Sequence, residues 1–214
     1  MTLGSVPALA WTTPNGGGSV VAEYRQLERT TAPILAVQRN AQHDFAHGVA
    51  SSETGAPLRI AFGRDSSGPV EAAFAFRLAI PRNARIVAAH IEGRAASFDV
   101  APLDIGIRVY DVGNVAPFVF GSGTALSAHA PLGTLSVMWQ PPAFLGGELV
   151  ATPDLAALVR AVVARPDWNA GLTIGFVFAP LGSASGLRRF ENHASGSPPR
   201  IVVDWAPDSP LSGH

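Results

Sequence analysis

Cysteine and lysine are both absent from this chain of 214 residues, and only 14% of its residues are charged. Without cysteine there is neither a disulfide framework nor a thiolate metal site. All fifteen basic side chains other than histidine are arginines, which indicates compositional bias, although bidentate arginine contacts would also suit a packed assembly surface. The formal net charge is −1 and the arginines are scattered, so we expect no binding to nucleic acid or to an anionic membrane.

Long apolar runs are missing as well. The first residues, "MTLGSVPALAWTTPNGGGS", have no basic n-region and only a short apolar stretch, so they do not read as a secretory signal. No segment of about twenty apolar residues is present, which predicts no membrane insertion. We therefore expect a protein that is made without a signal peptide and reaches its destination by another route.

Hydrophobic residues, in contrast, make up 47% of the chain, enough for one sizeable core. Residues 1–33 contain the spacer "TTPNGGGS" and are predicted to form an extended N-terminal arm, within which 20–30 could be a short helix or an edge strand. Residues 34–206 are predicted to form a single β-sandwich domain. Residues 207–214, with the sequence "PDSPLSGH", are predicted to be a polar tail.

Several segments alternate apolar and polar residues with period two, the pattern of half-buried antiparallel strands with one face toward solvent. "LDIGIRVYDV" places Ile105 and Ile107 on one face and Asp104 and Arg108 on the other. The same pattern occurs in "AAFAFRLAIP", "GLTIGFVFAP" and "PRIVVDWA", and further strands are predicted in "PLRIAFGR", "ARIVAAHIEGRA" and "LRRFENHA". Turn residues separate these segments at intervals of roughly ten positions.

One segment, "TPDLAALVRAVVARPDW", predicts an amphipathic helix. Thr152 is expected as its N-cap, Pro153 as its first residue and Pro166 as its stop. The helix would bury a stripe at i, i+3, i+4, i+7 and i+8, formed by Leu155, Leu158, Val159, Val162 and Val163. A lone helix among many strands is expected to cover an open end or face of the sandwich.

The order of these segments resembles the DNRLRE-type jelly-roll domains of bacterial surface and secreted proteins. The likeness rests on "AIPRNARIVAAHIEG", on the tryptophan-bearing "SVMWQPP", on the helix followed by Trp168 and Gly171, and on the ending "ENHASGSPPRIVVDW". It spans residues 35–206, approximately. The resemblance implies an all-β, antiparallel jelly-roll sandwich without catalysis, used for binding, spacing or adhesion.

Two functions follow as expectations from that resemblance and from the arm. The first is a structural or decoration subunit of a surface or virion assembly, such as a bacteriophage head or tail decoration or a fibre base, whose partners are other protein subunits. The second is a carbohydrate-binding adhesion module of a bacterial surface protein, whose ligand is a glycan. Both place the protein in a virion or in an extracellular surface assembly.

Signatures of catalysis are not convincing. "GSASG" at 182–186 has its serines at the wrong places for a nucleophile elbow, and "GSGTAL" at 121–126 lacks the βαβ context of a dinucleotide fingerprint. A glycosidase would need two facing carboxyl groups. No such pair can be nominated among the dispersed acids Asp99, Asp104, Asp111, Glu148, Glu191 and Asp204. We expect neither enzymatic activity nor a cofactor.

Aromatic residues are the candidates for binding. A glycan site would need exposed rings beside polar groups, and Trp139, Phe144 and Tyr110 are the candidates for stacking on a sugar, although core positions remain open for them. Trp168 is expected to pack under the helix. In the arm, Trp11 and Tyr24 are candidates for anchoring a neighbouring subunit.

The stretch "QHDFAH" holds His43 and His47 four residues apart. On a helix these imidazoles would be neighbours and could share zinc, whereas along a strand they would lie about 13 Å apart at roughly 3.3 Å per residue. No third ligand can be named, and calcium would need more clustered carboxylates than Asp44, Glu53 and Asp65 provide. A metal site is the minority interpretation. The preferred one places both histidines on the surface of a strand, in an interface that titrates near neutral pH.

Overall fold

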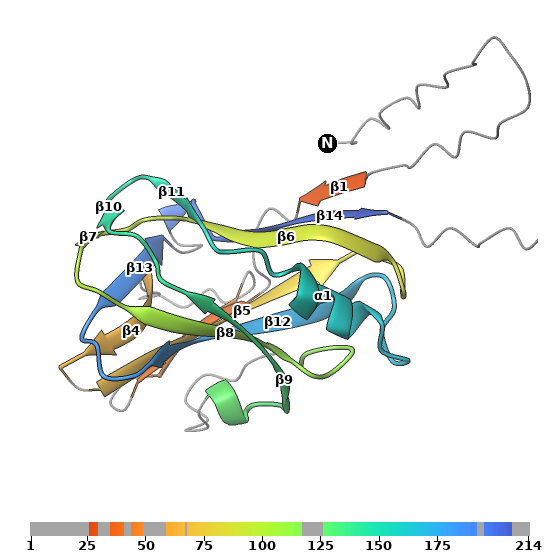
Figure 1. Cartoon of the computed structure of the whole chain (residues 1–214), viewed down its shortest axis with the longest axis horizontal. Coiled ribbons are helices and arrows are strands. Elements are labelled where there is room, and N and C mark those ends of the chain that lie inside the picture. Colours follow the sequence, from red (N-terminus) through yellow and green to blue (C-terminus); the bar gives the residue numbers. More distant parts are fainter. Residues whose placement is uncertain are drawn as a thin grey trace, which may run out of the picture.

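The computed structural model describes residues 26–29, 35–40, 44–48, 59–66, 68–116, 126–191 and 195–206. Two antiparallel sheets pack face to face in this part of the chain, with the core between them (Figure 1). The smaller sheet has the order β1–β14–β6–β11, formed by Gln26–Arg29, Arg200–Ala206, Arg85–Arg94 and Leu149–Ala151. The predicted all-β sandwich is confirmed.

The larger sheet has the order β13–β4–β5–β12–β8–β9. Its strands are Leu187–Glu191, Arg59–Asp65, Gly68–Leu78, Leu172–Leu181, Asp104–Tyr110 and Leu132–Trp139. β2 (Leu35–Asn40) pairs with β5 and with β3 (Asp44–Gly48). A separate two-stranded ribbon joins β7 (Phe98–Asp99) to β10 (Phe144–Leu145), and a 3-10 turn, η1, covers Leu126–Ala128. The chain crosses between the two sheets repeatedly, as expected of a jelly roll.

β1 lies within the range predicted as an arm. Its pairing runs from Gln26 opposite Trp205 to Arg29 opposite Val202, so this short segment is an edge strand of the sandwich. Of the two interpretations of residues 20–30, the strand is therefore correct for Gln26–Arg29.

The core forms because alternate residues of facing strands turn toward each other. Phe74 and Phe76 on β5, Phe176 and Phe178 on β12 and Ile201 on β14 are all fully buried. Full burial of each such side chain contributes about 1.5–3 kcal/mol. The predicted inward faces of these strands are thus confirmed.

The prediction that the other face of each strand is solvated is wrong for the middle of β5. Ala73 and Ala75 are buried on the outer side of the larger sheet, in a second cluster with Tyr110, Leu126 and Val177. The Tyr110 hydroxyl donates to the Leu126 carbonyl, which ties η1 to this side of the sheet. The chain that follows β8 covers the sheet here, so both faces of β5 are buried over its middle, from Ala72 to Phe76.

The helix α1 runs from Ala156 to Val163, and its predicted apolar stripe is buried. Its predicted start is wrong, because the Thr152 hydroxyl accepts from the Ile91 N–H at 3.0 Å and thereby joins β6. The N-cap position is Leu155, whose side chain makes no capping bond. Asp154, one residue earlier, supplies the acceptor instead: its carboxylate accepts from the Ala156 N–H at 3.0 Å. In Figure 1, α1 lies between the two sheets at one end of the sandwich.

Trp168 follows the helix and is completely buried, as predicted. Its indole N–H donates to the Ile80 carbonyl at 2.9 Å, so the ring joins the turn after α1 to the end of β5.

Candidate interaction surface

The aromatic residues expected to meet a glycan are buried. Trp139 is 4% exposed, and Phe144 and Tyr110 are fully covered. Trp139 stacks on Phe62 with 5.8 Å between ring centroids, and Phe144 stacks on Phe190 at 5.4 Å. Trp139 and Phe144 belong to the main core between the sheets, and Tyr110 belongs to the second buried cluster on the outer side of the larger sheet. None of the three rings can therefore stack on a sugar.

Three of the four residues proposed to contact partners lie outside the described residues: Trp11, Tyr24 and His43. His47 lies in β3, at the register position opposite Ala36, and its side chain is outside the description. Asp44–Gly48 is a strand, so the helical turn that would have placed the two imidazoles side by side is not formed there. The strand interpretation is confirmed for Asp44–Gly48, whereas the role of the two histidines in an interface stays a prediction.

Exposed apolar side chains occur instead on β7, directly after it, on β10 and on β11. These strands lie at one end of the sandwich (Figure 1). Phe98 is 70% exposed and stands directly opposite Leu145, which is 57% exposed. Val100 and Leu149 are exposed to a similar degree. We call Phe98, Val100, Leu145 and Leu149 the apolar corner.

Hydrogen bonds to main-chain groups fix the conformation of this corner. The turn after Leu145 uses Gly146 and Gly147 at φ of 61° and 80°, values that favour glycine. The Glu148 carboxylate accepts from the Leu145 N–H at 3.0 Å, and the Ala95 N–H donates to the Glu148 carbonyl at 2.8 Å. The exposed side chains are therefore presented on a well-bonded turn and a short ribbon.

A buried arginine supports the base of the corner. The Arg188 guanidinium donates to the carbonyls of Pro142 at 2.9 Å and Ala101 at 2.8 Å, and it lies over the Phe144 ring. Burial lowers the pKa of Arg188, while the nearby Asp99 charge acts in the opposite direction. Asp99 is itself paired with Arg189 at 3.1 Å. Charged groups thus flank the apolar corner without covering it.

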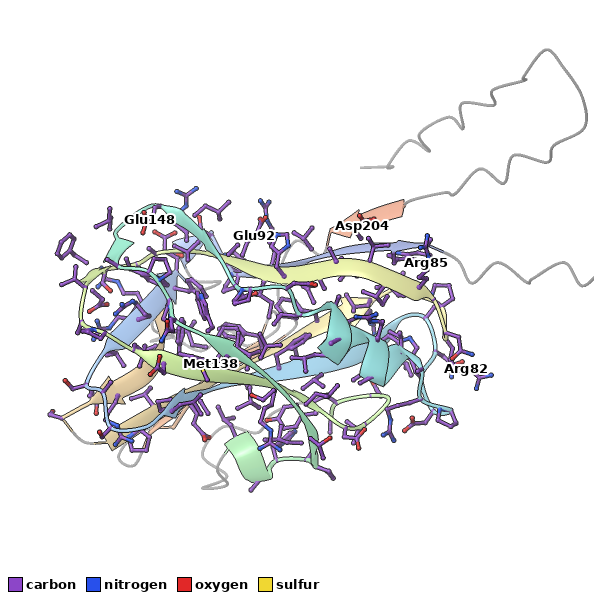
Figure 2. All side chains as sticks on the ribbon, viewed as in Figure 1. Arg82, Arg85, Glu92, Met138, Glu148 and Asp204 are labelled. Atoms are coloured by element: carbon purple, nitrogen blue, oxygen red, sulfur yellow. The ribbon has the colours of Figure 1, made fainter. Side chains whose placement is uncertain are left out.

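A polar groove of about 250 Å³ adjoins the corner on the outer side of the smaller sheet. Leu149 belongs to both features, since it is also one of the residues that line the groove. Glu92, Arg94 and Arg200 supply its charges. Figure 2 shows Glu92 and Glu148 toward the same side of the molecule, on β6 and beside the β10–β11 turn.

Glu92 organises the charges of this groove. Its carboxylate accepts from Arg200 Nε at 2.6 Å and from His90 Nε2 at 3.0 Å. Burial alone would raise the pKa of Glu92, but the hydrogen bonds and positive charges of His90 and Arg200 outweigh it and hold the pKa below its ordinary value. With one carboxylate facing two guanidinium groups, the groove has an excess of positive charge and could accept an anionic group.

Among the described residues, no three histidine, aspartate or glutamate side chains are grouped so that they could hold a metal ion. No helix in the described ranges is long and apolar enough to cross a membrane. A comparison with known protein families finds none that matches the chain, and no curated protein matches it either.

Sequence reasoning missed the apolar corner for an identifiable reason. It chose Trp139, Phe144 and Tyr110 as exposed rings, and all three are buried. Phe98 sits in "AASFDVAP", a stretch too short to show periodicity, and its exposure depends on pairing with Leu145, which is distant in sequence. The groove likewise joins β6, β11 and the turn before β14.

Proposed function

We propose that the protein is a non-catalytic structural or decoration subunit of a surface or virion assembly and acts through protein–protein contacts. The apolar corner is the single observation that carries this proposal. Soluble monomers rarely expose contiguous large apolar side chains, and such patches mark contact surfaces. Phe98 and Leu145 are more than half exposed although they lie on a well-bonded ribbon, so a partner can bury them at little cost in conformational entropy.

The surroundings of the corner also fit an interface. Buried patches at interfaces have an apolar centre and a polar rim. The Arg189–Asp99 pair and the Arg94 side chain, which donates to the Gly147 carbonyl, supply polar groups beside the four apolar residues. The resemblance to DNRLRE-type domains, which implies binding and spacing rather than catalysis, supports the same proposal. We propose further that the assembly is a bacteriophage-type particle or a bacterial surface structure.

The proposal is tested by replacing Phe98 and Leu145 together with serine in a tagged copy of the full chain. In cells that make the protein, the tagged wild type should co-purify within a complex of fixed stoichiometry, measured by native mass spectrometry. The double variant should keep its thermal unfolding midpoint and be lost from that complex. Met138→Ser is the matched control, because Met138 is 65% exposed on β9, away from the corner. Incorporation of the folded double variant at the wild-type level would refute the proposal.

A second function, carbohydrate binding, is supported by one observation. The Phe98 ring is exposed, and the next residue of the same ribbon, Asp99, is paired with Arg189. Sugars bind where an exposed ring and polar groups occur together. Phe98→Ala should then abolish binding on a glycan array. Trp139→Ala cannot serve this purpose, because Trp139 packs in the core and its loss would destabilise the fold.

A further inference from the structure

The apolar corner and the start of β1 lie at opposite ends of the smaller sheet. β14 runs antiparallel to β6, from Arg200 opposite Glu92 to Ala206 opposite Arg85. Gln26, the first residue of β1, stands opposite Trp205 and therefore at the Arg85 end. Leu149 stands opposite Arg94, at the other end. Figure 1 shows β1 and the β7–β10–β11 corner displaced from each other along the length of the molecule.

The sequence that precedes β1 has the chemistry of an apolar ligand. Residues 1–22 contain no charged side chain and include Leu9 and Trp11. Burial of such a segment removes no charge from water, whereas burial of a charged one would cost several kcal/mol. The corner in turn offers four apolar side chains and no charge of its own. Segment and corner therefore match in polarity.

The distance from β1 permits contact with a neighbouring molecule. Gln26 comes fifteen positions after Trp11, and a chain of that length spans at most about 50 Å. The ten residues of β6 give the sheet a length of about 33 Å. A chain of this length can thus extend past the end of the sheet.

We infer that the segment around Leu9 and Trp11 docks on the apolar corner of a second copy of this chain, in a head-to-tail contact. The inference rests on the proposed function and names the partner of its contact surface. Because β1, which the arm precedes in the sequence, begins at the end of the sheet opposite the corner, a pair joined by one such contact leaves one arm and one corner unfilled. Such a heterologous contact propagates into a chain or closes into a ring.

Two full-length variants test this inference by complementation. The arm variant carries Leu9→Ser and Trp11→Ser, and the corner variant carries Phe98→Ser and Leu145→Ser. Sedimentation velocity should show wild-type protein in species larger than a monomer, and each variant should associate with itself about thirtyfold more weakly or not at all. A mixture of the two should form a one-to-one heterodimer, because the arm of the corner variant meets the corner of the arm variant. The control, Met138→Ser, should associate like the wild type.

Other outcomes overturn the inference. A monomeric wild-type protein means that the arm does not join copies, and cross-links between arm and corner within one chain would show that the molecule covers its own corner. Variants that still associate, or a mixture that stays monomeric, exclude a head-to-tail contact through these residues. Incorporation into the cellular complex separates this failure from that of the proposed function. If the arm variant is incorporated and the corner variant is not, another protein fills the corner and the proposed function stands. If both variants are incorporated, the head-to-tail contact and the proposed function both fail.

Discussion

Arg188 is a buried cation that is compensated by main-chain oxygens and a ring face. It is 1% exposed, and its guanidinium reaches carbonyls of two separate segments, at Ala101 and at Pro141 and Pro142. Buried charges are expensive unless hydrogen bonds replace their water shell. Here the bonds also fix the chain before β8 against the chain before β10, so a single side chain determines the shape of the base of the corner.

Replacement of Arg188 by alanine should reduce the free energy of unfolding by about 3 kcal/mol, because it leaves buried carbonyls without a donor and removes packing on Phe144. Urea denaturation followed by tryptophan fluorescence measures the change. Arg189→Ala is the neighbouring control: it breaks a partly exposed pair with Asp99 and should cost under about 1 kcal/mol. If both variants lose the same free energy of unfolding, the hydrogen bonds of Arg188 to the carbonyls do not stabilise the fold more than the surface ion pair of Arg189 does.

Glu92 makes a pH-dependent contribution to stability. A carboxyl group whose pKa is lower in the folded than in the unfolded chain stabilises the fold above its unfolded pKa, about 4.3 for glutamate, and this contribution is lost as the pH falls through the folded pKa. Glu92→Gln should therefore cost about 1 kcal/mol at pH 7 and progressively less below about pH 4. Denaturant midpoints of both proteins across this range give the result. The double variant with Arg200→Gln should cost less than the sum of the two single changes, and simple additivity would contradict the pairing.

At the scale of single residues, the sequence predicted which side chains face the core more reliably than which remain exposed. Leu158 and Val162 were correctly placed inside because helical spacing assigns them to one face. The exposure of Phe98 has no local signal, since an alternating strand would bury a phenylalanine at such a position. It depends on the ribbon with Leu145 and on the turn at Gly146, features set by tertiary structure.

At the scale of elements, β6 and β13 approach each other closely at Gly93. A methyl group added to Gly93 would lie 2.5 Å from the Phe190 ring, which is fully buried between the sheets. Gly93→Ala should therefore force the ring out of place and destabilise the protein by about 2 kcal/mol. Thermal unfolding provides the measurement. Gly133→Ala on β9 is the matched control, because there the added methyl group meets its nearest atom at 3.5 Å. Equal unfolding midpoints for the two variants would contradict the predicted clash with Phe190.

The start of α1 depends on Asp154, which bonds two elements at once. Its carboxylate accepts from the Ala156 N–H in the first turn and from the Ala89 N–H of β6 at 2.9 Å. Asp154→Ala should lower the free energy of unfolding by about 1–2 kcal/mol, whereas Asp154→Asn keeps an acceptor oxygen and should lose much less. Denaturant titration distinguishes the two. Equal losses would mean that charge, rather than the acceptor, determines the effect.

Strand prediction succeeded where a segment was long enough to show its period. β8, β12 and β14 each extend over at least seven residues and were recognised with the correct inward faces. β7 and β10 have two residues each, too few for any pattern, and they exist because they pair with each other. The start of α1 was placed too early because Thr152, a good N-cap by type, bonds to β6 instead.

At the scale of the whole molecule, opposite ends of the sandwich carry different chemistry. Figure 2 places Arg82 and Arg85 toward the end with α1 and Glu148 toward the end with β10. The formal net charge of the chain is −1, so the molecule as a whole has little net charge. Copies of this protein therefore have little long-range electrostatic attraction to bring them together, and any contact between copies must gain its free energy from apolar burial at short range.

The effect of salt on self-association therefore distinguishes an apolar contact between copies from an electrostatic one. Ion pairs on a surface weaken as salt screens them, and the Debye length falls from about 10 Å at 0.1 M to about 3 Å at 1 M. Burial of apolar surface does not weaken in this way, and sulfate strengthens it. If the corner joins copies through Phe98 and Leu145, self-association measured by sedimentation velocity should persist from low to high sodium chloride and increase in ammonium sulfate. Dissociation on the addition of salt would instead assign the contact to the arginine and carboxylate groups around the groove, with the apolar corner left to a different partner.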